Sequence, residues 1–140
     1  MALTRYESLM SEYDELLSIE ERDMKSCGLY CDNIIWINKN MMECKKCCVL
    51  AEEIGHHYTT AGNILNLTDI KNIKKENIAR DWAINKLLPF DEFINTVKAG
   101  NYTIPDVAEY LGLDEEFICC SIEHYKRKLG VEFPICENEL

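Results

Sequence analysis

The sequence has no apolar segment that approaches the 18 or so residues needed to cross a membrane. It also lacks a surplus of basic residues, because 15 lysines and arginines stand against 25 acidic residues, for a net charge of −10. Binding to DNA or RNA depends on a basic surface, so we expect no direct nucleic-acid partner. The N-terminus is amphipathic and acidic, unlike a signal peptide, and we expect a cytoplasmic protein without a membrane partner.

Cysteine, by contrast, is abundant, with eight residues in a chain of 140. A disulfide framework is typical of small secreted proteins, and no secretion signal is visible here. We therefore expect most of the cysteines to be small buried hydrophobic residues in a reducing compartment. A structural zinc site on Cys44 and Cys47 is a weaker alternative, because its candidate partners, Cys27 and Cys31, lie across a predicted strand.

The first part of the chain is expected to form a helix, a small antiparallel sheet and a second, longer helix. Asn40, followed three residues later by Glu43, resembles a capping box that would start the longer helix. The predicted elements are an amphipathic helix over residues 3–17, a short strand over 19–24, a hairpin of 28–31 and 34–37 turning at Asp32 and Asn33, and a helix from Asn40 to about Tyr58.

The rest of the chain is expected to be mostly helical, which makes the whole an α+β fold. Length predicts one domain, residues 1–140. After the end of the long helix at "TTAGN", we expect a loop over 64–73, helices over 74–89, 90–100, 104–112 and 115–130, and a loose tail over 131–140.

The segment Val49–Thr60, "VLAEEIGHHYTT", carries two adjacent glutamates and two adjacent histidines. At 100° per residue, Cys47, Ala51, Ile54 and Tyr58 form an apolar stripe on the predicted helix, and the acidic side chains and His56 lie opposite. Glu52 and His56 are one turn apart and can converge on one point, with Glu53 beside them.

This is the arrangement of the HExxH zinc motif, with glutamate in place of its first histidine. Two other interpretations remain open from this window. The glutamates and histidines can form an ordinary solvated polar face, and His57 can pair with Glu53 one turn back as an accessory ligand. Because a catalytic zinc normally takes three protein ligands, Glu76 in the next predicted helix is the candidate third ligand. Ala79 and Ala83 would let that helix approach closely.

Two successive segments carry a resemblance to a known family. "CCVLAEEIGHHYTTAGNI" followed by "ENIARDWAINKLLP" resembles the ImmA/IrrE family of metallopeptidases, over about residues 5–130. The family has a helix of the form HExGH, followed by a helix that begins E-x-x-A and ends near Leu-Pro. The second signature is matched in order by Glu76, Ala79, Trp82, Ala83, Leu88 and Pro89.

The resemblance implies a minimal zincin-like domain, with residues 1–89 holding the sheet and the metal-site helices and 90–130 forming a helical subregion. It implies a cytoplasmic zinc endopeptidase of phage or mobile-element type, whose substrate is a helix-turn-helix repressor. By position, Glu53 is the catalytic base and His56 and Glu76 are metal ligands. Glu52 occupies the position of the first ligand.

Glutamate at position 52 changes what this site would hold. A Glu/His/Glu set is harder in ligand character, so Mn²⁺ or Fe²⁺ become alternatives to the expected Zn²⁺. The added negative charge also opposes the acidification of a bound water that catalysis requires. The substitution therefore keeps open a second function, a catalytically impaired protein that binds the repressor or another partner without proteolysis.

Residues 104–130 have the rhythm of a helix-turn-helix. Six acidic residues stand against three basic ones between positions 101 and 130, and the start of the second helix, where a recognition helix meets the bases, is Asp-Glu-Glu. This composition favours a helical hairpin that packs on the core or docks a partner protein, and not a DNA reader.

Overall fold

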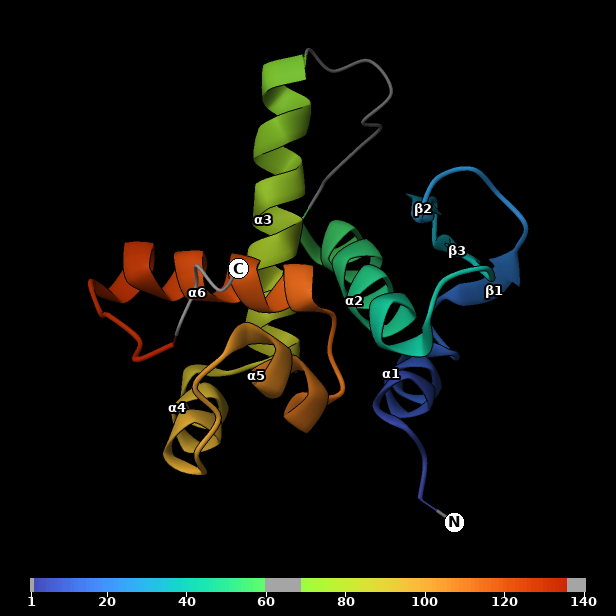
Figure 1. Ribbon diagram of the computed structural model, residues 1–140. Helices are drawn as coiled ribbons and strands as arrows, with labels where there is room; N and C mark the ends of the chain where they lie inside the picture. Colours follow the sequence, from blue (N-terminus) through green and yellow to red (C-terminus); the bar gives the residue numbers. More distant parts are fainter. Residues whose placement is uncertain (1, 60–68, 136–140) are drawn as a thin grey trace. The chain divides into compact units, whose positions relative to one another are not determined.

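The computed structural model describes residues 2–59 and 69–135, with side chains given for all of these except 69–73. The α+β fold class predicted from the sequence is confirmed (Figure 1). The elements, in order, are α1 (Arg5–Tyr13), β1 (Ser18–Arg22), β2 (Gly28–Cys31), β3 (Ile34–Asn38), α2 (Glu43–Thr59), α3 (Asp69–Leu87), α4 (Phe90–Lys98), α5 (Ile104–Leu111) and α6 (Glu115–Leu129).

The fold divides into two compact units, Met1–Ala83 and Ile84–Leu140. The first unit contains the sheet, α1, α2 and most of α3, and therefore all of the candidate site residues. The second unit contains the end of α3 and the helices α4, α5 and α6. No helix in the described part of the chain is long and apolar enough to cross a membrane.

The three-stranded sheet has the order β1-β3-β2. The predicted hairpin is confirmed, with β2 and β3 antiparallel and both turn residues, Asp32 and Asn33, at positive φ (48° and 67°). The expectation of an antiparallel sheet is wrong for β1, which pairs parallel to β3 with Ser18 opposite Ile34. Strand β1 pairs with β3 and not with β2, its neighbour in the sequence, and apolar alternation along a strand carries no information on that choice of partner.

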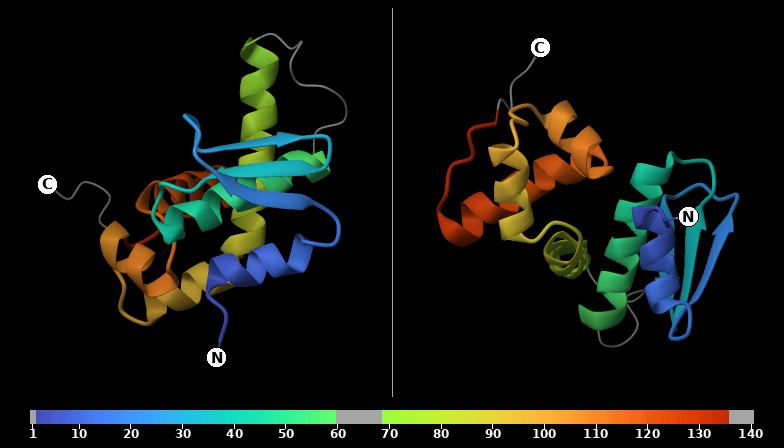
Figure 2. Two further views of the ribbon diagram at one scale, coloured as in Figure 1. Left: turned by 90° about the vertical axis from the view of Figure 1, so that its right-hand side faces the viewer. Right: turned by 90° about the horizontal axis from the view of Figure 1, so that it is seen from below.

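The core of the first unit lies between the sheet and the helices that cover one of its faces (Figure 2). Ile35 and Ile37 of the central strand are fully buried, as are Leu50 and Ile54 of α2. Burial of each such side chain contributes about 1.5–3 kcal/mol. Tyr58, predicted to extend this apolar stripe, is instead 49% exposed, and its ring stacks on Trp82 with centroids 5.4 Å apart.

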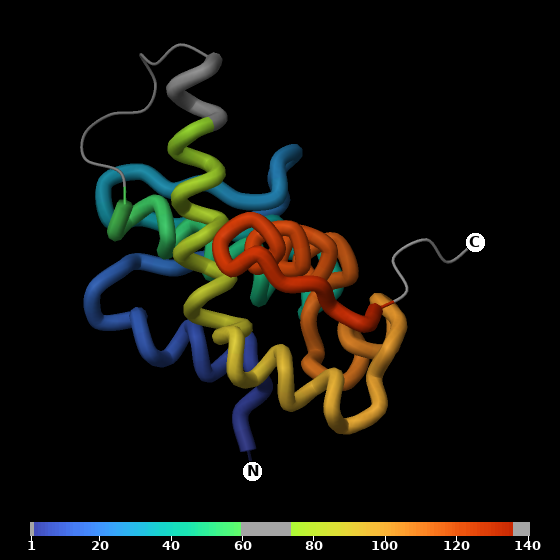
Figure 3. The backbone as a smooth tube through the Cα atoms, turned by 90° about the vertical axis from the view of Figure 1, so that its left-hand side faces the viewer, coloured from blue at the N-terminus to red at the C-terminus, as the bar shows by residue number. Residues whose placement is uncertain are grey.

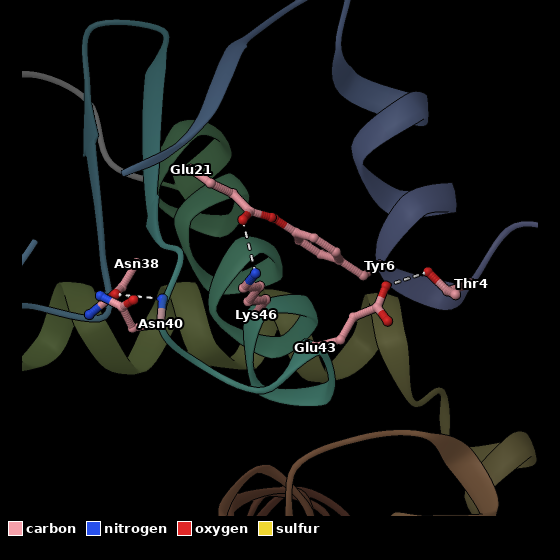
Figure 4. Close-up of polar contacts among 7 residues, drawn as sticks. All are labelled: Thr4, Tyr6, Glu21, Asn38, Asn40, Glu43 and Lys46. Carbon is pink, nitrogen blue, oxygen red and sulfur yellow. Dashed lines mark hydrogen bonds and ion pairs between the residues drawn. The ribbon is translucent and has the colours of Figure 1, made fainter. Parts of the chain in front are cut away.

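The start of α2 differs from the prediction. The helix begins at Glu43, and Asn40 lies before it, donating through Nδ2 to Asp23 (2.9 Å). Glu43 does not close a capping box with Asn40, because its carboxylate accepts a hydrogen bond from the Thr4 hydroxyl (2.8 Å; Figure 4). The capping box that does form is at α1, where Thr4 and Glu7 satisfy each other's backbone N–H groups.

The start of α3 lies earlier than predicted. Residues 69–73 were expected in a loop, but the helix already begins at Asp69. Neither proline nor glycine occurs between Asp69 and Leu87, so no residue in this range breaks the helix. Helix α2 is described as far as Thr59, which agrees with the predicted end near Tyr58. Residues 60–68, which include the rest of "TTAGN" and the remainder of the predicted loop, lie outside the described residues.

In the second unit, α4, α5 and α6 follow one another with short connections (Figure 3). The predicted stops at Gly112 and Gly130 are confirmed, with φ of 69° and 65°. The segment after α6, predicted to be loose, is packed as far as Ile135. The Phe133 ring stacks on Phe93 with centroids 4.4 Å apart, which buries both side chains.

The cysteines are less buried than the sequence suggested. Seven of them are described, and none of the seven forms a disulfide. Among these seven, only Cys47 and Cys48 are buried, while Cys27, Cys31 and Cys119 are exposed. Burial raises the pKa of the Cys47 thiol to about 11, so that thiol is the small hydrophobic residue that we expected of most of them.

Candidate metal centre

Two close backbone approaches position α2, and each occurs at a glycine. A Cβ atom on Gly55 would overlap the backbone carbonyl of Ala79 in α3, so the two helices can be this close only with hydrogen at that position. Ala79 and Ala83 are completely buried, as expected for small residues at a close helix crossing. Figures 1 and 2 show the C-terminal part of α2 beside α3.

The second approach is made by strand β2. A Cβ atom on Gly28 would lie 2.7 Å from Val49 Cγ1 and 3.1 Å from Glu53 Oε2. Strand β2 therefore lies directly over the face of α2 that carries Glu53. The side of α2 that the sequence presents as polar is thus partly covered by protein, with β2 on one flank and α3 on the other.

The helix crossing brings His56 and Glu76 together. His56 Nε2 lies 3.1 Å from Glu76 Oε1, and the imidazole is only 4% exposed while the carboxylate is 57% exposed. Burial lowers the pKa of His56, but the hydrogen bond to Glu76 and the charges of Glu76, Glu53 and Glu52 raise it above its ordinary value. The same hydrogen bond lowers the pKa of Glu76.

Glu53 is a half-buried member of this group. Burial, followed by the negative charges of Glu76 and Glu52, raises its pKa to about 7, although the charge of His56 acts in the opposite direction. A carboxylate whose pKa is near neutrality is suited to accept and return a proton. Glu53 is therefore beside the His56–Glu76 pair and electrostatically coupled to both of its members.

Glu52 has a different partner. Its Oε1 accepts a hydrogen bond from Arg80 Nε at 2.9 Å, across the helix crossing. Burial raises the pKa of Glu52, whereas the hydrogen bond and the charge of Arg80 lower it; the net direction is upward. The sequence pattern gave no reason to pair Glu52 with Arg80, because these residues belong to different helices, 28 positions apart.

His57, the candidate accessory ligand, points to the sheet. Its Nδ1 lies 2.9 Å from the hydroxyl of Tyr30 in β2, and the two rings make an edge contact with centroids 5.6 Å apart. Sequence reasoning did not identify Tyr30. The alternation of side chains along β2 could have identified it, because Gly28 and Tyr30 lie on the same face of the strand. That face lies over Glu53 and His57, which are one turn apart on α2.

The donor atoms fit a metal ion in part. In a tetrahedral site with bonds of about 2.0–2.2 Å, two ligand atoms lie roughly 3.3–3.6 Å apart, and the His56–Glu76 separation is close to this. Glu52 does not join them in the observed conformation, because it is bound to Arg80. Within residues 2–59 and 74–135, no three His, Cys, Asp or Glu side chains are gathered as a ready metal site.

These elements define an α+β domain with an acidic, histidine-containing centre between two successive helices. The chain matches the family Peptidase_M78, described as the IrrE N-terminal-like domain, over residues 2–123. It therefore belongs to this metallopeptidase family, which confirms the resemblance seen in the sequence. Searches of curated proteins and of solved structures gave no match.

Proposed function

We propose that this protein is a metal-dependent endopeptidase of the ImmA/IrrE type. Membership of the family supports a metallopeptidase in general. The observation that carries the proposal for this chain is the convergence of His56 Nε2 and Glu76 Oε1 at 3.1 Å, next to the half-buried Glu53. A divalent ion would be held by His56 and Glu76, with Zn²⁺ as the expected ion and Mn²⁺ or Fe²⁺ as alternatives in so carboxylate-rich a centre.

When bound, such an ion supplies a Lewis acid that polarises the peptide carbonyl and acidifies a water molecule. The remaining roles fall to the residues of the chain. Glu53 accepts the proton of the attacking water at its carboxylate and returns it to the amine that leaves. The close approach of Gly28 to Glu53 shields that carboxylate in part from bulk water.

The proposed substrate is a helix-turn-helix repressor, and the proposed origin is a phage or a mobile element. Both statements rest on the resemblance to ImmA/IrrE proteins. The net charge of −10 supports a repressor as substrate, because a protein that binds DNA carries a basic surface and opposite charges favour the encounter. Cleavage of the repressor would relieve repression.

The test combines metal analysis with a cleavage assay on a helix-turn-helix repressor, to be sought among the proteins encoded near this gene. We expect stoichiometric metal after gentle purification, and a single chelator-sensitive cut that mass spectrometry can locate. Glu53→Gln is expected to lower the cleavage rate by a factor of about 100 or more, because it removes the proton acceptor and keeps the shape of the side chain. Glu15→Gln, which changes an exposed glutamate outside the helices, is the matched control. Cleavage by Glu53→Gln at the wild-type rate would contradict the proposal.

A second function is favoured by one observation, the ion pair between Glu52 and Arg80. If the centre is catalytically impaired, the protein acts as a module that binds the repressor without proteolysis. This alternative expects a complex with intact repressor that persists in chelator. Size-exclusion chromatography of the mixture, with and without EDTA, separates the two functions.

A further inference from the structure

The ion pair between Glu52 and Arg80 is held by the same packing that forms the candidate centre. Arg80 follows Glu76 by one turn on α3, and Glu52 precedes His56 by one turn on α2. Both pairs therefore span the crossing that Gly55 and Ala79 make close. The Glu52 side chain is 21% exposed and that of Arg80 is 38% exposed, so the pair is partly shielded from water.

The charges near this crossing are unbalanced without Arg80. Glu52, Glu53 and Glu76 interact electrostatically with one another or with His56, which is neutral until it takes up a proton. The guanidinium of Arg80 is always charged. It therefore supplies a permanent positive charge beside Glu52, whose carboxylate accepts its hydrogen bond.

A cation bound to Glu52 would meet this charge at short range. With Arg80 Nε 2.9 Å from Glu52 Oε1 and a metal–oxygen bond of about 2 Å, the ion and the guanidinium would lie within about 5 Å of each other. Two positive charges at that distance repel in a partly shielded site. An ion that binds through Glu52 is therefore either repelled by the guanidinium of Arg80 or bound only after the ion pair between Glu52 and Arg80 has broken.

We propose that Glu52 is the partner of Arg80 and not a metal ligand, and that Arg80 weakens the binding of a divalent ion by His56 and Glu76. This inference rests on the proposed metal centre and assigns Arg80 as a residue that determines its affinity. The opposite role is chemically reasonable, since a hydrogen bond to a ligating carboxylate usually strengthens the site. The two roles differ in sign, so one substitution decides between them.

The experiment measures the dissociation constant of Zn²⁺ by calorimetry on the whole chain, after removal of metal with chelator, and requires no substrate. We expect Arg80→Gln to bind Zn²⁺ about tenfold more tightly, because it removes the repulsion and releases Glu52. Glu52→Gln is expected to change the constant less than about twofold. The double variant is expected to keep only the part of the gain that comes from removing the charge of Arg80, because it has no carboxylate at position 52 to release.

Two further variants control for charge and folding. Arg22→Gln removes the same charge from an ion pair with Glu20 on β1 (2.9 Å), and should leave zinc affinity within about twofold of wild type if the effect of Arg80 is local. Arg80→Lys retains the charge and should bind as wild type does. Arg80→Lys also tests the inference if Arg80→Gln does not fold. Tighter zinc binding by Arg80→Lys, which keeps the positive charge, would overturn the inference.

The outcomes separate this inference from the proposed function. Weaker or unchanged binding by Arg80→Gln overturns the inference, and so does a tenfold loss in Glu52→Gln. His56→Ala is expected to abolish binding in the wild-type and Arg80→Gln backgrounds. Zinc binding that is indifferent to His56 would instead overturn the proposed centre itself.

Discussion

At the scale of single residues, Gly55 decides whether the candidate centre can form. Two preferences compete at this position. Alanine is favoured over glycine in a helix by about 1 kcal/mol. Against this, the added methyl group would overlap the Ala79 carbonyl, which belongs to the backbone of α3 and cannot turn away as a side chain can.

We expect the overlap to dominate, because forcing an extra group into a packed interface costs about 1–3 kcal/mol. Gly55→Ala should therefore lower the free energy of unfolding by about 1–2 kcal/mol in urea titrations. It should also weaken zinc binding, because moving α3 away from α2 separates Glu76 from His56. Gly112→Ala is the control: it places a side chain at φ 69° with no atom within 4 Å, so it should cost stability without changing zinc affinity. A more stable Gly55→Ala protein would contradict the close crossing.

At the scale of elements, Glu21 links three of them. From β1 it accepts hydrogen bonds from the Tyr6 hydroxyl of α1 (2.8 Å) and from Lys46 Nζ of α2 (2.9 Å; Figure 4). Burial alone would raise the pKa of Glu21, but the bonds from Lys46 and Tyr6 outweigh it and lower the pKa below 4.5. The ionised carboxylate is thus the form that the fold stabilises.

This direction determines the dependence of stability on pH. Because the pKa is lower in the folded state, the contribution of Glu21 is fully present above about pH 4.5 and is lost as the pH falls through the folded value. Glu21→Gln should lower the free energy of unfolding by about 1 kcal/mol at pH 7, a modest amount because the carboxylate is partly exposed. The difference from wild type should disappear in acid. Tyr6→Phe, which leaves the Lys46 pair intact, should retain most of the pH dependence. An equal effect of Glu21→Gln at pH 7 and pH 3 would contradict the assignment.

At the scale of the whole molecule, charge restricts the partners. The net charge is −10, and the helix that would read DNA in a helix-turn-helix, α6, begins with the exposed residues Glu115 and Glu116. We expect no retardation of duplex DNA in a gel shift at moderate salt, because the protein would bring negative charge to the phosphates. The test should include DNA that carries the operator of the repressor proposed as substrate. A complex that weakens steeply as salt increases would contradict this expectation.

Much of the fold could be predicted from local signals. The hairpin at Asp32 and Asn33, and the helix ends at Gly112 and Gly130, follow from residues that adopt positive φ readily. The wrong predictions concern residues and strands whose actual partners lie far away in the sequence. Glu43 was read as a cap for Asn40, but it bonds to Thr4, which is 39 positions away. The parallel pairing of β1 with β3 was missed for the same reason.

The sequence by itself determined which residues the centre has available: Glu52, Glu53 and His56 at helical spacing, and Glu76 on a second helix whose small residues permit close packing. Their chemistry and periodicity follow from residue type and position along the chain. Only the tertiary structure decided how they are paired, with His56 joined to Glu76 and Glu52 joined to Arg80. The physical reason is that the two helices cross at Gly55 and Ala79, and the angle and register of that crossing, which depend on backbone contact between distant segments, select the partner of each charge.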